Sequence, residues 1–278
     1  PARSHETSPY SRWSATTRSS GLPTVTTRRQ LLARIADLSV HQRDGVRAPH
    51  KPLLLLFALG RVRRQDERLV GYREVHRRVG ELLREYAPAR RTNAGYPFWY
   101  LRNDQLWVVA EAPDVPLKKG GGSPPVGYLK EHDTRGGFPE SVHPLLAGDE
   151  ELQREAASVV LQRHFPRSIH EELLESVGLP AEWADDPVRL PTEKGRRARR
   201  AGFRKEVLEA YRHRCAVCGF DVRVAGRAFG LDAAHVMWHQ ADGPDEVTNG
   251  LALCALHHRA LDRGVIGLDG ERRLLVSA

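Results

Sequence analysis

Cysteine, methionine and long hydrophobic runs are all scarce in this chain of 278 residues, which contains three cysteines and one methionine. Three cysteines are too few for the disulfide framework of a small secreted domain. The longest apolar run, residues 52–59, is too short to cross a bilayer, so we expect a buried helix there and no membrane association. No secretory hydrophobic segment follows the N-terminus, and we therefore expect a cytoplasmic protein.

Acidic residues are in the minority, with 35 Asp and Glu against 43 Lys and Arg and a net charge of +8. A positive excess often means only a solvated surface, but here it is concentrated in residues 193–205, where Glu193 is the single acid. Such a segment binds nucleic-acid phosphates through counterion release and carries little sequence information. The charge pattern therefore favours a polyanionic partner.

The three cysteines fall into two short motifs near the C-terminus, Cys215-Ala-Val-Cys218 and Cys254-Ala-Leu-His257. Two pairs of soft ligands at this spacing can close a tetrahedron around a structural zinc. The alternative is that Cys215 and Cys218 are small core residues and that Cys254 is unrelated to them. Because His258 directly follows His257, only one of the two can face the zinc if the other faces substrate. The spacing from Cys254 favours His257 as the fourth ligand.

The segment around the second motif has the pattern of two strands followed by a helix. Residues 229–235 and 247–253 are expected to be strands, residues 238–246 a surface loop, and residues 256–263 a short helix that stops before Gly264. A hydrolytic nuclease needs an activated water and a cation that neutralises charge on the phosphate.

His235, Asn249 and His258 are the candidates for these roles, although each histidine taken alone is more often structural. The stretch from Cys215 to Gly264 resembles an HNH endonuclease of the ββα-metal type. The resemblance is carried by Asp-Ala-Ala-His235, Thr-Asn249-Gly-Leu-Ala-Leu-Cys and His-His258-Arg-Ala-Leu-Asp-Arg-Gly. It implies that His235 is the general base, that His258 binds a catalytic Mg²⁺ or Mn²⁺, and that Asn249 constrains the loop and orients the His235 ring.

One position departs from this pattern. Many HNH relatives have an acidic or histidine metal ligand immediately before the general base, whereas this chain has Ala234 there. The second protein ligand of the catalytic metal is therefore open. Asp232 is the first candidate, and Asp262 is the second.

Four regions follow from composition and pattern: a disordered tail over residues 1–26, an N-terminal domain over 27–180, a linker over 181–192 and a C-terminal domain over 193–278. The N-terminal domain is expected to be mainly helical. Helical patterns cover residues 28–38, 52–65, 72–86 and 150–164, and a small β-hairpin is expected from residues 98–101 and 105–109. The expected fold class is therefore α+β, with a zinc-stabilised ββα-metal domain at the C-terminus. That domain is also expected to contain a helix over residues 203–212 and a hairpin at Asp269-Gly270.

Two segments of the N-terminal domain combine basic residues with proline and aromatic rings, Pro-His-Lys-Pro-Leu-Leu-Leu from Pro49 and Gly-Tyr-Pro-Phe-Trp-Tyr-Leu-Arg-Asn-Asp from Gly95. Taken alone, the second segment is as readily explained as a strand that enters a hydrophobic core as it is by a role in binding. Over residues 31–178 the chain resembles the sulfur-binding domains of phosphorothioation-dependent restriction endonucleases, the McrA-like enzymes that add a C-terminal HNH module. The resemblance implies an apolar pocket with a cationic rim for DNA and sulfur, formed by His50, Lys51, Pro52, Arg90, Arg91, Asn93, Tyr96, Pro97 and Tyr100.

Relatives often have arginine after the histidine of the first segment, where this chain has Lys51. Lysine offers a point charge without the bidentate fork of arginine, so we expect it to contact a phosphate or a single base acceptor.

The expected function is that of a modification-dependent DNA endonuclease, which binds phosphorothioated double-stranded DNA and cuts the backbone nearby. Since one HNH site cuts one strand, a homodimer is the expected assembly for a double-strand break. One rival is an HNH nuclease that reads another mark, such as methylcytosine, in a base-flipping pocket. The other rival is a non-catalytic DNA-binding protein that retains only the zinc fold.

Overall fold

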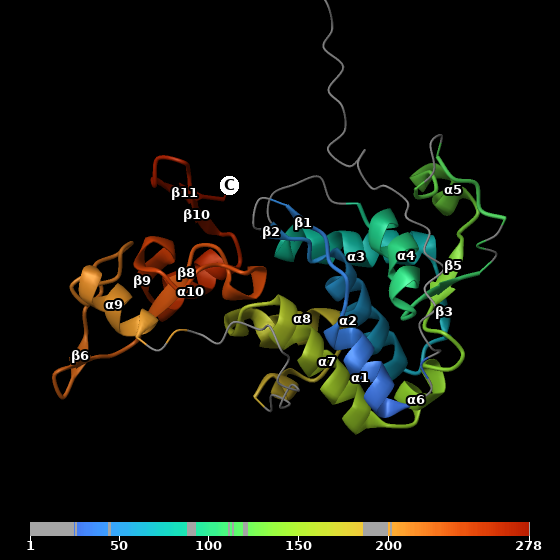
Figure 1. Cartoon of the computed structure of the whole chain (residues 1–278), viewed down its shortest axis with the longest axis horizontal. Coiled ribbons are helices and arrows are strands. Elements are labelled where there is room, and N and C mark those ends of the chain that lie inside the picture. Colours follow the sequence, from blue (N-terminus) through green and yellow to red (C-terminus); the bar gives the residue numbers. More distant parts are fainter. Residues whose placement is uncertain are drawn as a thin grey trace, which may run out of the picture.

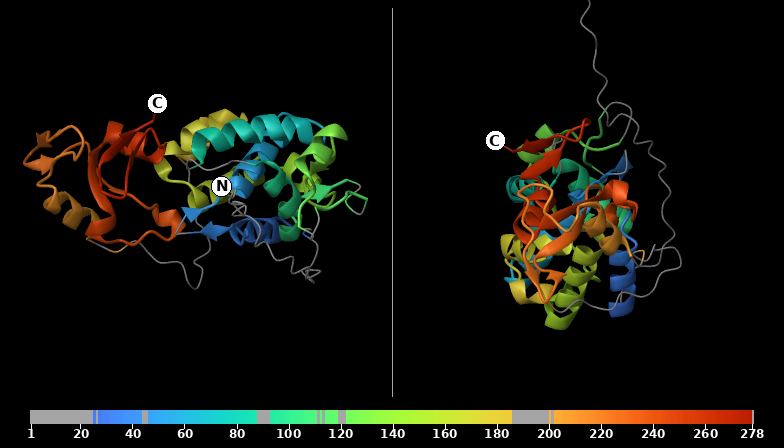
Figure 2. Two further views of the ribbon diagram at one scale, coloured as in Figure 1. Left: turned by 90° about the horizontal axis from the view of Figure 1, so that it is seen from above. Right: turned by 90° about the vertical axis from the view of Figure 1, so that its left-hand side faces the viewer.

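The computed structural model describes residues 25, 27–43, 46–87, 93–110, 112, 114–118, 122–185, 200 and 202–277. The described residues form two packed domains that lie side by side, each with its own hydrophobic core (Figures 1 and 2). The N-terminal domain is mainly helical, and the C-terminal domain is built around a pair of strands. In the described part of the chain, no helix has the length and apolar character needed to span a bilayer.

Helix α2 (His50–Arg63) runs through the centre of the N-terminal domain. The uninterrupted apolar run of residues 53–59 leaves this helix without a polar face, so it is buried on all sides. Pro52 lies in the first turn, where the missing N–H costs no helical hydrogen bond. At the other end, Gly60 allows a close approach of α8 (His170–Val177), since a Cβ at residue 60 would lie 1.9 Å from the carbonyl oxygen of Val177.

Helices α3 (Tyr72–Tyr86), α7 (Glu150–His164) and α8 pack on α2, and α1 (Arg28–Ala36) packs on α7. Each has an apolar stripe that faces the core. In α3 the stripe recurs every three or four residues and consists of Tyr72, Val75, Val79, Leu82, Leu83 and Tyr86. The helices predicted over residues 72–86 and 150–164 are confirmed to the residue, and the other two are each confirmed within two residues at either end.

A small antiparallel sheet closes one side of the N-terminal domain, with β5 (Arg135–Gly137) between β3 (Leu69–Gly71) and β4 (Val108–Val109). Two-residue strands β1 (Gln42–Arg43) and β2 (Val46–Arg47) form a separate pair. Short helices α5 (Val126–Glu131), α6 (His143–Ala147) and η2 (Arg167–Ile169) complete this domain.

The β-hairpin predicted over residues 98–101 and 105–109 is wrong. Its first half forms helix α4 (Gly95–Tyr100), which continues into the 3-10 helix η1 (Leu101–Asp104). Phe98, Trp99 and Leu101 are all buried, a spacing that one face of a helix accommodates and an alternating strand does not. Pro97 has no N–H for a strand partner and lies early in the helix instead.

The C-terminal domain contains the predicted ββα unit. Strands β8 (Leu231–His235) and β9 (Gly250–Cys254) pair antiparallel, with Leu231 opposite Cys254 and His235 opposite Gly250. Helix α10 (Ala255–Asp262) follows β9 directly, and α9 (Phe203–Ala210) packs against both strands. The second strand starts later than predicted, because residues Val247–Asn249 form the 3-10 helix η5.

Two further hairpins lie outside this unit. Strands β10 (Ile266–Leu268) and β11 (Leu274–Val276) flank Asp269-Gly270, as predicted. Strands β6 (Arg223–Val224) and β7 (Arg227–Ala228) form the other hairpin, which extends away from the N-terminal domain (Figure 1).

The packed N-terminal domain extends beyond the residues assigned to it from sequence. Val25 is buried in its core, and the 3-10 helix η3 (Ala181–Ala184), at the start of the expected linker, buries Trp183 and Ala184 there. The rest of the expected tail and linker, residues 1–24, 26 and 186–192, lies outside the described residues.

Two glycines test the central packing. We expect G60A to lower the free energy of unfolding by about 2 kcal/mol or more, because its methyl group would overlap backbone that cannot move freely. G80A is the matched control: Gly80 lies within α3 and has no atom within 4 Å of the added Cβ, so alanine should stabilise the protein by about 0.5–1 kcal/mol. Urea unfolding of the two variants measures both values, and equal effects would contradict the close contact of α2 with Val177.

Candidate functional site

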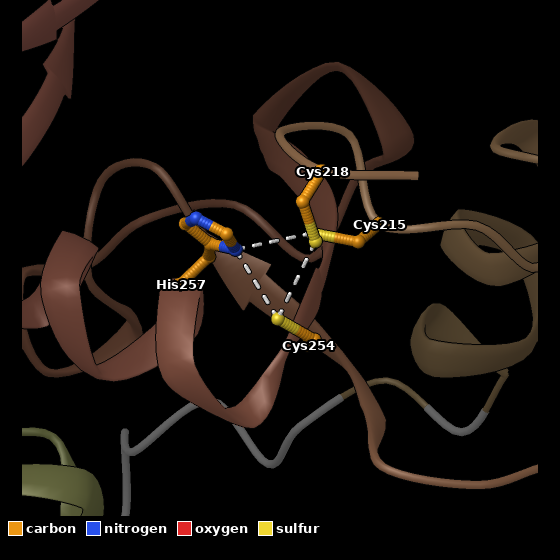
Figure 3. Close-up of side chains that lie close together, drawn as sticks. All are labelled: Cys215, Cys218, Cys254 and His257. Carbon is orange, nitrogen blue, oxygen red and sulfur yellow. Dashed lines mark hydrogen bonds between the residues drawn. The ribbon is translucent and has the colours of Figure 1, made fainter. Parts of the chain in front are cut away.

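The two cysteine motifs bring four possible metal ligands together. The thiol sulfurs of Cys215, Cys218 and Cys254 and an imidazole nitrogen of His257 all lie within 4.8 Å of one another (Figure 3). Cys254 Sγ is 3.2 Å from His257 Nδ1, Cys215 Sγ is 3.6 Å from the same nitrogen, and Cys218 Sγ is 3.9 Å from Cys254 Sγ. A tetrahedral zinc with bonds of about 2.0–2.3 Å separates its ligand atoms by roughly 3.5–3.8 Å, so the cluster could bind zinc.

Local backbone geometry supports the same ligand set. Burial alone would raise the pKa of the Cys215 thiol, but the backbone N–H groups of Cys218, Cys254 and Val217 point at its sulfur and lower its pKa to about 6. The thiolate is the form that binds zinc. Cys254 ends β9 and His257 lies in the first turn of α10, so the strand-to-helix junction carries half of the cluster.

His235, the predicted general base, ends strand β8. Its Nε2 lies 2.7 Å from Oδ1 of Asp245, and both side chains are almost fully buried. This hydrogen bond assigns the ring proton to Nε2, so Nδ1 is the nitrogen with the basic lone pair. The ring also stacks on Phe203 at 4.2 Å between centroids, which fixes its plane.

Asp245 is the functional candidate that sequence reasoning missed. It is 2% exposed, although it lies in a segment predicted to be a surface loop. Burial alone would raise the pKa of this carboxyl, but the backbone N–H of Arg200, the ring of His235 and the nearby His239 lower it. Only its place after Gly243-Pro244, a tight turn that can direct a side chain inward, hinted at such a role.

Asn249 bonds the loop between β8 and β9. Its carboxamide oxygen accepts from the backbone N–H of Met237, and its nitrogen donates to the carbonyls of Met237 and Pro244. Asn249 thereby fixes both ends of the turn that delivers Asp245, while Asp245 itself bonds the His235 ring.

His258 lies between the two acidic candidates. Its Nδ1 is 3.7 Å from Oδ2 of Asp232, and its Nε2 is 3.4 Å from Oδ2 of Asp262. His258 lowers the pKa of Asp232, chiefly through a hydrogen bond, and Arg204 adds to the effect. Ala234 is fully buried in the core, so this strand position cannot face a metal. A carboxylate oxygen and an imidazole nitrogen at Asp232 and His258 suit Mg²⁺ or Mn²⁺.

Most of the basic segment, residues 193–199 and 201, lies outside the described residues. The described arginines on either side have partners within the domain. Arg200 donates to Glu206 and to Asp245, and Arg204 donates to the carbonyl oxygen of Leu231.

In the N-terminal domain, the structure differs from the expected cationic rim. His50 is largely buried at the start of α2, where burial and the nearby His41 lower its pKa to about 4, so it is neutral at physiological pH. The ammonium of Lys51 lies 2.5 Å from Oδ2 of Asp104, and both residues are buried. Asp104 also accepts from the backbone N–H of Ser39. Lys51 is therefore tied into the core and does not present a free charge.

Tyr96, Pro97 and Tyr100, three of the remaining predicted reader residues, lie on α4, which packs against α2. The rings of Tyr96 and Tyr100 stack at 6.3 Å with an interplanar angle of 12°, and the Lys118 ammonium lies 5.7 Å from the Tyr96 ring. Just before the helix, the Asn93 side-chain oxygen accepts from the backbone N–H of Gly95. Pro52 and Pro97 are buried, and Arg90 and Arg91 lie outside the described residues.

Residues 28–182, more than half of the chain, match the family described as the ScoMcrA-like DNA sulfur-binding domain. Residues 215–269 match the HNH endonuclease family. A search of curated proteins gives no match.

Among solved structures, the chain is similar to the sulfur-binding domain of ScoMcrA complexed with phosphorothioated DNA, with 29% identity, a TM-score of 0.49 and coverage of 53% of this chain and 94% of that one. It is also similar to the Type IV phosphorothioation-dependent restriction endonuclease ScoMcrA, with 27% identity and a TM-score of 0.52. That match covers 62% of this chain and 37% of that one. A third match, to the sulfur-binding and SRA domains of ScoMcrA with phosphorothioated DNA, has 25% identity, a TM-score of 0.50 and coverage of 72% and 58%.

The chain thus spans well under two thirds of the larger ScoMcrA structures that it matches. Its two matched regions lie within the two packed domains, and the second contains the His235, Asn249 and His258 site. The chain therefore belongs to the ScoMcrA-like DNA sulfur-binding domain family, carries an HNH endonuclease domain after that domain, and is a nuclease that acts on DNA.

Proposed function

We propose that this protein is a modification-dependent endonuclease that binds phosphorothioated double-stranded DNA through its N-terminal domain and hydrolyses the backbone nearby through its C-terminal domain. The observation that carries the proposal is the presence, on one chain, of a sulfur-binding family domain and an HNH site whose base has a carboxylate partner. Related domains of this family have been solved with phosphorothioated DNA.

The chemistry of α4 and the start of α2 fits this ligand. Sulfur in place of a phosphate oxygen is larger, more polarisable and less strongly hydrated, so it suits an apolar wall. Tyr96, Pro97 and Pro52 would supply that wall, and a neutral His50 can lie beside sulfur without desolvating a charge. Arg90 and Arg91 would bind the surrounding phosphates, and Asn93 and Tyr100 would reach the neighbouring nucleotides.

In the C-terminal domain, Nδ1 of His235 would accept the proton of the attacking water while Asp245 stabilises the charged ring. His258 and Asp232 would hold the catalytic Mg²⁺ or Mn²⁺, which when bound neutralises charge on the phosphate and the leaving oxygen. Asn249 keeps Asp245 and His235 in register. The products would be 3′-hydroxyl and 5′-phosphate ends.

We further propose that the cluster of three cysteines and His257 binds a structural zinc and that a C2 dimer, or two sequential nicks, produces a double-strand break. The core of the C-terminal domain is small, and two of its buried residues, Cys215 and Cys254, are themselves zinc-ligand candidates. Domains of this size commonly depend on metal for stability.

Two duplexes of identical sequence, one with a single stereodefined phosphorothioate, test the function as a whole. With Mg²⁺ or Mn²⁺ present, we expect binding and cleavage of the sulfur-bearing duplex only, measured by gel shift and end mapping. Equal cleavage of both duplexes would keep the HNH assignment and refute the sulfur-dependent one. Selective cleavage of a methylcytosine duplex would favour the rival reading of the N-terminal domain.

Substitution of two adjacent histidines, one at a time, distinguishes the two proposed metal sites. We expect H257A to lose its zinc, measured by elemental analysis of the purified protein, and to unfold its C-terminal domain. H258A should keep the zinc and the fold but lose cleavage, because its ring faces Asp232 on the other side of α10. Retention of zinc in H257A, or loss of zinc in H258A, would contradict the ligand set.

The Asp245–His235 pair is tested by D245N, which keeps the shape of the side chain but removes its charge. We expect kcat to fall by about 100-fold with little change in KM for DNA, because an amide stabilises the protonated ring less well than a carboxylate does. The exposed neighbour supplies a control, E246Q, which should retain wild-type kcat. A wild-type kcat in D245N would remove Asp245 from the site.

A further inference from the structure

One side chain of the N-terminal domain contacts an acidic residue beside the nuclease site. The hydroxyl of Ser168, in η2, donates to Oδ2 of Asp262, the last residue of α10. Asp262 is only 5% exposed, although its side chain is a carboxylate. A buried carboxylate needs partners, and here the N-terminal domain supplies one of them.

A second partner of Asp262 is His258. The two residues lie four positions apart on α10, and Nε2 of His258 is 3.4 Å from Oδ2 of Asp262. The opposite nitrogen of the same ring, Nδ1, faces Asp232 at 3.7 Å. A continuous chain of contacts therefore runs from Ser168 through Asp262 and His258 to Asp232.

The two carboxylates differ in exposure, and this difference separates their roles. The Asp232 side chain is 55% exposed, so water, a metal ion and DNA can reach it. The Asp262 side chain is 3% exposed and is shielded by the N-terminal domain. Histidines that bind metals characteristically donate their second ring nitrogen to a carboxylate, which orients the ring. Asp232 thus suits the ligand position, and Asp262 suits the orienting position.

Other contacts hold α10 in place against the N-terminal domain. Arg263, directly after α10, is bonded to Glu172 of α8 and to Glu85 of α3, and its guanidinium lies 5.4 Å from the Tyr86 ring. Arg259 donates to the carbonyl oxygen of Ser168 at 3.2 Å. These charged contacts fall on the same side of α10 as Asp262, which keeps the Ser168 hydroxyl within reach.

The loop after His235 also rests on the N-terminal domain. Trp238 packs against the core of that domain, and the 3-10 helix η4 (His239–Ala241) contacts α7. Between this loop and α10 the two domains line an open pocket of about 290 Å³, whose walls include Pro49, Met237 and Asp262. The interface therefore touches the surroundings of both nuclease histidines.

We propose that Ser168 is a positioning residue of the nuclease site, whose hydroxyl fixes Asp262 so that Asp262 holds the His258 ring in the orientation that binds the catalytic metal. The inference rests on the proposed function, because it takes His258 and Asp232 as the metal ligands. Docking of the N-terminal domain then does more than deliver DNA: it completes the support of the metal site.

The test measures Mn²⁺ binding by the full zinc-loaded chain in the absence of DNA. Titration calorimetry and the electron paramagnetic resonance signal of free Mn²⁺ give the Kd. We expect S168A to raise the Kd for Mn²⁺ about tenfold, since loss of a partner behind a metal ligand typically weakens binding by about 10–100-fold. S168T keeps the hydroxyl and should retain the wild-type Kd. S158A is the matched control, because it removes another hydroxyl of the same domain, one bonded to Gln162.

The outcomes separate this inference from the proposed function. An unchanged Mn²⁺ Kd in S168A, together with loss of Mn²⁺ binding in H258A, would overturn the role of Ser168 and leave the nuclease site intact. Unchanged Mn²⁺ binding in H258A would overturn the metal assignment itself. The positioning role is supported if S168A raises the Kd for Mn²⁺, S168T restores it, and S168A binds a phosphorothioated duplex as the wild type does. A general loss of folding would instead weaken the binding of both Mn²⁺ and the duplex.

Discussion

Helix α10 imposes the constraint on which the rest of the C-terminal domain depends. Successive side chains on a helix diverge by about 100°, so the adjacent residues His257 and His258 must face different neighbours. His257 meets the three cysteines, and His258 meets Asp232 on β8. One turn later, Asp262 and Arg263 meet the N-terminal domain. A helix of two turns therefore joins the cluster of candidate zinc ligands, the candidate nuclease site and the domain interface, and a shift of its axis would disturb all three.

Buried carboxylates mark the places where distant parts of the chain meet. Asp104 joins the end of η1 to Lys51 on α2, Asp245 joins a loop to His235, and Asp262 joins α10 to Ser168. A buried charge without partners is costly, so each carboxylate favours the single arrangement in which its partners are close. In the N-terminal domain this ties Lys51 into the core, and in the C-terminal domain it orients the His235 ring.

Local sequence patterns were sufficient to predict the elements whose buried residues recur at the spacing of a single helix or strand. The amphipathic stripe of α3, the apolar run of α2 and the ββα order around Cys254 were all predicted from spacing. Residues 98–101 and 105–109 were predicted as a hairpin, because aromatic residues favour strands. Packing of Phe98 and Trp99 into the helical core outweighed that local preference. Strand propensity alone carries no information about which side chains elsewhere in the chain are available for packing.

The sequence by itself located the candidate residues of the C-terminal site, because Cys-x-x-Cys and Cys-x-x-His are local patterns whose ligand geometry follows from short spacing, and His235, Asn249 and His258 lie beside them. Only the tertiary structure decided which partners those groups receive. Asp245 reaches His235 through a turn held by Asn249, Asp262 is closed off by Ser168 some 90 residues earlier in the chain, and Lys51 is paired with Asp104. The Ser168–Asp262 and Lys51–Asp104 contacts join residues 94 and 53 positions apart, and all of these contacts form because buried charges require partners.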